Sequence, residues 1–88
     1  MFLHIVSVEY IDDYRLRLEF NDGSVKEIDL KEELYGEIFE PLKDVNFFKK
    51  VAVNPDTSTI EWPNGADFAP EFLYELGKNI KPDTQKAA

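Results

Sequence analysis

Residues 14–20 alternate strictly between apolar and charged side chains, and this alternation constrains the fold more than any other feature of the chain. The apolar members are Tyr14, Leu16, Leu18 and Phe20, and the charged members are Arg15, Arg17 and Glu19. A period of two places each set on one face of a β-strand. The segment therefore predicts a strand in a sheet that is covered on one face and open to water on the other.

Turn-forming residues frame this strand and predict a neighbour on each side. Acidic residues at 12–13 close a β-branched and aromatic segment at 3–10, and Asn-Asp-Gly at 21–23 precedes segment 24–30. Asp, Asn and Gly favour tight turns between antiparallel strands. The three segments therefore predict an antiparallel meander.

The third of these segments does not keep a regular alternation. Val25 and Ile28 differ in parity, so a regular strand cannot turn both side chains toward the core. We expect a β-bulge near the turn to bring them to the same face.

Short helices are expected over the middle of the chain. Asp29 is placed to cap a helix that ends at Gly36, and residues 44–50 form a second candidate. Pro41 interrupts any longer helix between them. The apolar residues of the second helix are expected to pack on the sheet.

A second hairpin and one longer helix are predicted beyond residue 50. Apolar segments 50–54 and 59–62 enclose the turn-forming residues 55–58, which is the pattern of a β-hairpin. In the last helix, Pro70 suits the first turn and Gly77 suits the position just past the end.

These elements predict an α+β fold with a small antiparallel sheet of about five strands, formed by the meander and the second hairpin. The sheet packs against short helices and one C-terminal helix. A chain of 88 residues has room for one core, so residues 1–80 are expected to form a single domain. Residues 81–88 have almost no apolar content and are expected to be a disordered tail.

Composition narrows the classes of function. The chain has no cysteine and one histidine, and it has 10 basic against 18 acidic residues, giving a net charge of −8. The lack of cysteine favours a reducing compartment, and no segment is apolar enough for a membrane span, so we expect a cytoplasmic protein. The negative charge predicts no direct contact with nucleic acid. The excess carboxylates either keep a small domain soluble or complement a basic protein partner. A weak homodimer formed through a sheet edge is a further expectation.

The residues that usually carry chemistry are not arranged for it. His4 stands alone in an expected strand, the serines lie in strands or turns, and the four glycines are isolated rather than clustered. The carboxylates match no loop spacing that binds calcium or magnesium and are explained by turns and helix caps. We therefore expect no catalytic, cofactor-binding or metal-binding residue and no cofactor.

The segment from Glu61 to Asp67 is the exception, because it places the sole tryptophan directly before a sharp turn. An exposed Trp62 would be an anchor for a partner, whereas a buried Trp62 would be a core residue with its indole N–H bonded to a turn carbonyl. Pro63 and Gly65 suit the turn, Asp67 is placed to cap the final helix, and the remaining turn residue is an asparagine. The candidate interaction or structural motif comprises Glu61, Trp62, Pro63, Asn64, Gly65, Asp67 and Glu71.

The run Ile-Glu-Trp-Pro-Asn-Gly-Ala-Asp-Phe-Ala-Pro-Glu-Phe-Leu, residues 60–73, resembles the signature of a bacterial family known as domain of unknown function 2442. Segments 20–30 and 39–48 resemble its earlier parts, so the resemblance spans about residues 3–77. It implies a compact α+β fold and no known activity. Some members of that family are similar to proteins encoded beside a small partner, as in toxin–antitoxin pairs, and others carry an added helix-turn-helix domain. We expect no such second domain in this chain.

Two functional hypotheses follow. The first is a non-enzymatic protein-interaction domain, in its narrower form an antitoxin-like neutraliser of a protein encoded by a neighbouring gene. The alternative is a small carboxylate-dependent enzyme or ligand-binding protein, whose site near Trp62 would use Glu61, Asp67 and Glu71. The alternative requires at least two of these carboxylates to converge, because paired acid and base groups must hold different protonation states.

Overall fold

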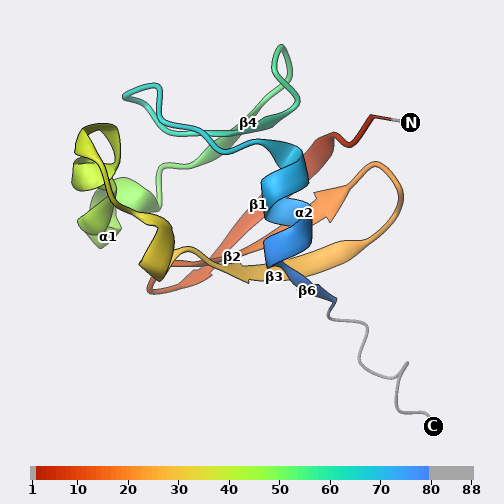
Figure 1. Cartoon of the computed structure of the whole chain (residues 1–88), viewed down its shortest axis with the longest axis horizontal. Coiled ribbons are helices and arrows are strands. Elements are labelled where there is room, and N and C mark those ends of the chain that lie inside the picture. Colours follow the sequence, from red (N-terminus) through yellow and green to blue (C-terminus); the bar gives the residue numbers. More distant parts are fainter. Residues whose placement is uncertain (1, 80–88) are drawn as a thin grey trace, which may run out of the picture.

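The computed structural model describes residues 2–79, and its strands and helices as far as α2 follow the order that the sequence predicts (Figure 1). The strands are β1 (Ile5–Asp12), β2 (Arg15–Phe20), β3 (Val25–Asp29), β4 (Ala52–Asn54), β5 (Thr59–Glu61) and β6 (Lys78–Asn79). The α-helices are α1 (Val45–Phe48) and α2 (Pro70–Leu76), and the 3₁₀ helices are η1 (Lys31–Glu33) and η2 (Glu37–Lys43). The predicted α+β class is confirmed.

The meander β1–β2–β3 is confirmed, and β6 extends it to a four-stranded sheet of order β1-β2-β3-β6. Strands β2 and β3 pair in regular register from Arg15↔Asp29 to Glu19↔Val25. The predicted bulge in the third strand is therefore wrong, and Val25 lies on the face opposite Ile28. Bulges interrupt β1 instead, between Ile5 and Ser7 and between Tyr10 and Asp12.

The second hairpin is also confirmed, but β4 and β5 form a sheet of their own. The backbone N–H of Ile5 donates to the carbonyl of Ser58 at 2.9 Å, which fixes the hairpin turn beside the start of β1. In Figure 1 this small sheet lies above the meander. The strands thus form two layers rather than one continuous sheet.

The helices are shorter than expected. The segment after Asp29 forms only the 3₁₀ turn η1, although the Asp29 side chain does accept a hydrogen bond from the backbone N–H of Lys31. Pro41 lies inside η2 and has no backbone N–H to donate to the carbonyl of Ile38 three residues earlier. Helix α1 is capped by Asp44, which accepts from the N–H of Asn46 at 3.0 Å.

The core lies between the inner face of the meander, the small sheet and the helices. Its buried apolar residues are Ile5, Leu16, Leu18, Phe20, Ile28, Leu30, Leu34, Leu42, Phe48, Ile60, Trp62, Ala66 and Leu73. From β1 to α2, every element except η1 contributes residues to this cluster or packs against it. The predicted tail, residues 81–88, lies outside the described residues. Within residues 2–79, no helix is long and apolar enough to cross a membrane.

Candidate interaction surface

The residues after β5 form a tight reversal of the chain. The N–H of Gly65 donates to the carbonyl of Trp62 at 2.8 Å, and the N–H of Trp62 donates to the carbonyl of Ala66 at 2.9 Å. Gly65 has a φ of 91°, a conformation that residues with a Cβ rarely adopt. The chain then returns beside β5, where Glu61 and Asp67 form an antiparallel bridge. The predicted turn is confirmed.

Asn64 fastens this turn to η2. Its Nδ2 donates to the backbone carbonyl of Ile38 at 2.9 Å, while its Oδ1 accepts from the N–H of Ala66 at 3.1 Å. The carboxamide therefore stabilises the turn internally and also joins it to a segment 26 residues away in sequence.

Trp62 is a core residue with 2% of its surface exposed. Its indole Nε1 donates to the carbonyl of Phe48 at 2.9 Å, and its ring lies 5.6 Å from the ring of Phe48. The buried alternative is confirmed, and an anchor made by an exposed Trp62 is excluded. The indole is enclosed because Trp62 follows β5 directly and packs against Phe48, the last residue of α1.

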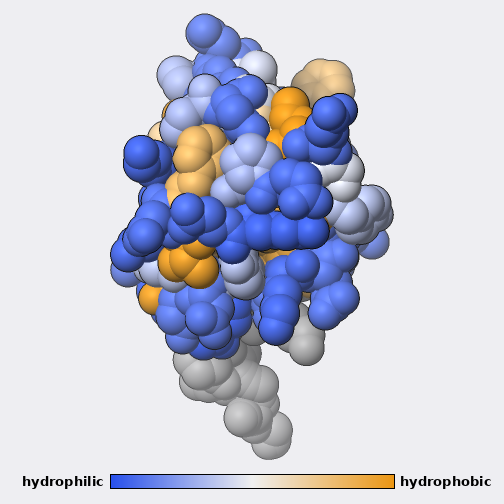
Figure 2. All heavy atoms as spheres, turned by 90° about the vertical axis from the view of Figure 1, so that its left-hand side faces the viewer, coloured by the Kyte–Doolittle hydropathy of each residue, from blue (hydrophilic) through white to orange (hydrophobic). Residues whose placement is uncertain are grey.

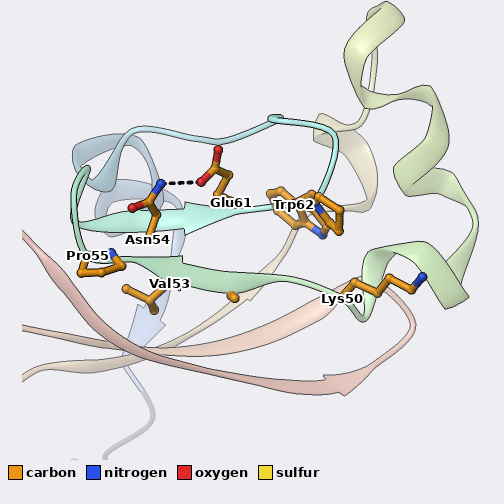
Figure 3. A pocket seen from close by; sticks show the side chains of 8 residues that line it. Lys50, Val53, Asn54, Pro55, Glu61 and Trp62 are labelled. Carbon is orange, nitrogen blue, oxygen red and sulfur yellow. Dashed lines mark hydrogen bonds between the residues drawn. The ribbon is translucent and has the colours of Figure 1, made fainter.

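The three carboxylates of the motif have separate environments. Glu61 accepts a hydrogen bond from Asn54 Nδ2 at 2.6 Å, as Figure 3 shows. Asp67 is exposed and does not cap α2, because the helix begins at Pro70 and its N-cap residue is Ala69. That capping prediction is wrong. Glu71 lies in the first turn of α2.

A shallow depression of about 370 Å³ adjoins the motif (Figure 3). It is lined by Lys50, Ala52, Val53, Asn54, Pro55, Glu61, Trp62 and Pro63. Glu61 is the only one of the three carboxylates that lines it. Among residues 2–79 no cluster of three His, Asp or Glu side chains could hold a metal ion.

Three phenylalanine rings form a stack that crosses from η2 to α2. The ring centroids of Phe39 and Phe68 are 4.8 Å apart, and the two planes make an angle of 21°. The ring centroids of Phe68 and Phe72 are 5.6 Å apart, with an angle of 17°. Phe72 is 40% exposed, and Ile38, beside Phe39, is 48% exposed. We call the three stacked phenylalanines, Phe39, Phe68 and Phe72, together with the adjoining Ile38, the aromatic strip.

Sequence reasoning missed the aromatic strip. The spacing of Phe68 and Phe72 predicts one apolar helical face, which reads as core packing, and nothing in the sequence places Phe39 beside them. The stack joins segments that are 29 residues apart, so only the fold brings it together. The end of the molecule that carries η2 and α1 is mostly hydrophilic, with apolar side chains in small separate areas (Figure 2).

Polar contacts hold α2, and with it Phe72, against the β2–β3 hairpin. Tyr74 donates from its hydroxyl to Asp22 at 2.6 Å, and Lys26 Nζ donates to the carbonyl of Tyr74 while lying 3.9 Å from the centre of its ring. Hydrogen bonds from the hydroxyls of Ser24 and Tyr74 and from the Ser24 N–H lower the pKa of Asp22 to about 2. The hydrogen bond to Asp22 in turn raises the pKa of Tyr74.

Residues 5–79 match the family described as protein of unknown function, DUF2442. The chain belongs to this family. No curated protein matches the sequence of the chain. The family assignment confirms the resemblance seen in the sequence and leaves the function of this DUF2442 chain open.

The DUF2442 chain is similar to a crystal structure from Nitrosomonas europaea ATCC 19718, named "Putative DNA Binding Protein NE0471". The TM-score is 0.78 and the sequence identity is 26%. The match covers 89% of this chain and 50% of the Nitrosomonas chain, so this chain spans half the length of that protein.

This similarity contradicts the prediction that the chain makes no direct contact with nucleic acid. The prediction relied on the net charge of −8, which describes the chain as a whole. Contact with a phosphate backbone depends on the local field, and Lys43, Lys49 and Lys50 are all exposed around α1. A net charge is therefore too coarse a measure to exclude such contact.

Proposed function

We propose that this DUF2442 chain is a non-enzymatic interaction domain that binds a protein partner through the aromatic strip. The observation that carries the proposal is the stack of Phe39, Phe68 and Phe72, whose outer member is 40% exposed. Isolated apolar residues are common on protein surfaces, whereas adjoining aromatic rings are typical of binding sites.

The strip is also held in place before any partner arrives. Asn64 fixes the backbone at Ile38, and Tyr74 fixes α2 two residues after Phe72. A surface whose side chains are already ordered loses less conformational entropy on binding. These contacts support the strip as a preformed contact area.

The carboxylate-dependent alternative has less support. It needs two carboxylates in one cleft, and Glu61 alone lines the depression beside the motif while its carboxylate is bonded to Asn54. An antitoxin-like role is a narrower form of the interaction proposal and would require that the captured partner be a toxin.

Affinity capture with matched variants tests the proposal. The wild-type chain, Phe72→Ser and Phe2→Ser would each be tagged and used to capture proteins from the source cells after nuclease treatment. Phe2 is 82% exposed and lies outside the strip, so it controls for the loss of an exposed aromatic side chain. We expect a stoichiometric partner with wild type and Phe2→Ser that is lost with Phe72→Ser. Equal recovery by all three proteins would contradict the role of the strip.

Direct contact with DNA is a second candidate, favoured by the similarity to the Nitrosomonas protein. The exposed side chains of Lys43, Lys49 and Lys50 would supply the phosphate contacts, although Lys43 also pairs with Glu40 at 3.1 Å. Such contacts weaken steeply as salt rises, because each releases bound counterions.

Fluorescence anisotropy with a labelled duplex tests this second candidate. If these lysines contact DNA, the triple change of Lys43, Lys49 and Lys50 to Ala lowers the affinity and reduces the salt dependence. Lys31→Ala, which changes an exposed lysine in η1, is the control. No binding by the wild-type chain at low salt would reject direct DNA contact by this chain.

A further inference from the structure

The Asn64–Gly65 pair lies on the surface and has the chemistry of a spontaneous modification site. Both residues are exposed. Glycine has no side chain to hinder its own backbone nitrogen, so that nitrogen can attack the Cγ of the preceding asparagine. The pair is therefore the most reactive asparagine sequence in residues 2–79, where the other asparagines precede Asp22, Phe47, Pro55 and Ile80.

The reaction needs no cofactor or oxidant. A bond forms between the Gly65 nitrogen and Asn64 Cγ, the bond from Cγ to Nδ2 breaks, and the side-chain nitrogen leaves as ammonia with the proton from Gly65. Water then opens the resulting cyclic imide, leaving aspartate or isoaspartate at position 64. The product carries a negative charge and has lost both Nδ2 hydrogens.

The folded turn occupies every group that the reaction uses. The attacking N–H of Gly65 donates to Trp62, the leaving Nδ2 donates to Ile38, and Oδ1 accepts from Ala66. Three hydrogen bonds must therefore be disturbed before the cyclic imide can form. Modification then requires local opening of the turn, and its rate follows the fraction of molecules that are open.

We infer that Asn64 is a latent deamidation site, protected by the closed turn, and that its conversion releases η2 from the turn. The carboxylate product cannot donate to the carbonyl of Ile38, and its charge faces that carbonyl oxygen. The buried end of the turn at Trp62 stays in the core, so the change acts on the strip through Ile38 and Phe39. The inference concerns the chain's own stability and does not depend on which partner the strip binds.

Peptide mapping by mass spectrometry tests the protection. The folded full-length chain and a synthetic peptide covering residues 60–68 would be incubated together in mildly alkaline buffer. We expect conversion at Asn64 to be at least about tenfold slower in the folded chain, because only open molecules react. Pro63→Ala loosens the turn and should speed conversion by about two- to fivefold. Equal rates in the chain and the peptide would overturn the protection.

A second measurement tests the release of η2. Hydrogen exchange at residues 37–43 would be compared between wild type, Asn64→Asp and the control Asn46→Asp, with α2 as the internal reference. We expect faster exchange in η2 for Asn64→Asp alone, while the amides of α2 stay unchanged. Unchanged exchange in η2 would overturn the inferred release, and loss of protection throughout the chain would show general unfolding and overturn it equally.

Discussion

The indole Nε1 of Trp62 donates a hydrogen bond of 2.9 Å to the backbone carbonyl of Phe48. Both residues are buried, and this contact joins the residue after β5 to the last residue of α1. The most distinctive side chain of the family signature is thus part of the core, and the surface beside it is formed by phenylalanines instead.

Replacing Trp62 tests that relationship. Trp62→Ala should lower the free energy of unfolding by about 3–5 kcal/mol because a large buried ring is removed. Trp62→Phe keeps most of the packing but leaves the Phe48 carbonyl without its donor, so a loss of about 1–3 kcal/mol is expected. Urea melts measure both values. Tyr35→Ala, at a residue that is 70% exposed, should stay within about 0.5 kcal/mol of wild type.

Helix capping gives a matched pair of variants. Asp44 caps α1 through the N–H of Asn46, so Asp44→Ala should cost about 0.5–2 kcal/mol. Asp67 caps nothing and lies across the bridge from Glu61, where like charges repel. Asp67→Ala should therefore leave the melting midpoint unchanged or raise it slightly. A loss from Asp67→Ala as large as that from Asp44→Ala would show that Asp67 has a structural contact after all.

Gly77 is required for space rather than for backbone conformation. A Cβ built there would lie 2.9 Å from Ile28 Cγ1 and 2.9 Å from Lys26 Cβ, whereas its φ is an ordinary −77°. Gly77→Ala should cost about 1–3 kcal/mol through overpacking. The cost should shrink when Ile28→Ala is added, because that change removes one clash.

Gly23 supplies the control for this double-mutant cycle. It has open space around it but a φ of 91°. Gly23→Ala should therefore cost about 1–2 kcal/mol whether or not Ile28 is changed. An equal coupling of both glycines to Ile28 would argue against the steric explanation for Gly77.

Asp22 should make the free energy of unfolding depend on pH in the acid range. Its pKa in the folded chain is about 2, below the ordinary value of 3.8, so its contribution is present above about pH 4 and is lost as the pH falls toward 2. Asp22→Asn should be less stable than wild type near neutral pH, and the difference should disappear near pH 2. Thermal melts across this range measure it, with Asp67→Asn as the control. If the difference in melting temperature between wild type and Asp22→Asn stays constant down to pH 2, the lowered pKa of Asp22 is contradicted.

Local patterns in the sequence predict much of this fold. The alternation at residues 14–20 gives the meander, and the turn residues at 21–23 and 63–65 take the conformations that they favour. The division into two sheets could not be predicted, because it depends on which strands pair over long sequence separations, as β3 does with β6. The difference in parity between Val25 and Ile28 led to a wrongly predicted bulge in β3. The strand is regular, and Val25 lies on the open face of the sheet.

The candidate surface was less predictable than the fold. Segment 61–67 could be identified from the sequence because it contains the sole tryptophan followed by turn-forming residues. Whether that tryptophan is buried could not be predicted. Burial follows from the position of the Phe48 carbonyl, which is a tertiary fact. The aromatic strip needs Phe39 beside Phe68, and that proximity arises from the turn that Asn64 fastens to η2.

Hydrogen exchange of the wild-type chain, alone and in complex with the partner recovered by capture, tests the central claim most directly. If the aromatic strip is the contact surface, binding should slow exchange at residues 38–39 and 68–72 and leave the β1–β2–β3 meander unchanged. Slower exchange confined to the meander, or to residues 43–50 around α1, with no change at the strip, would contradict the account.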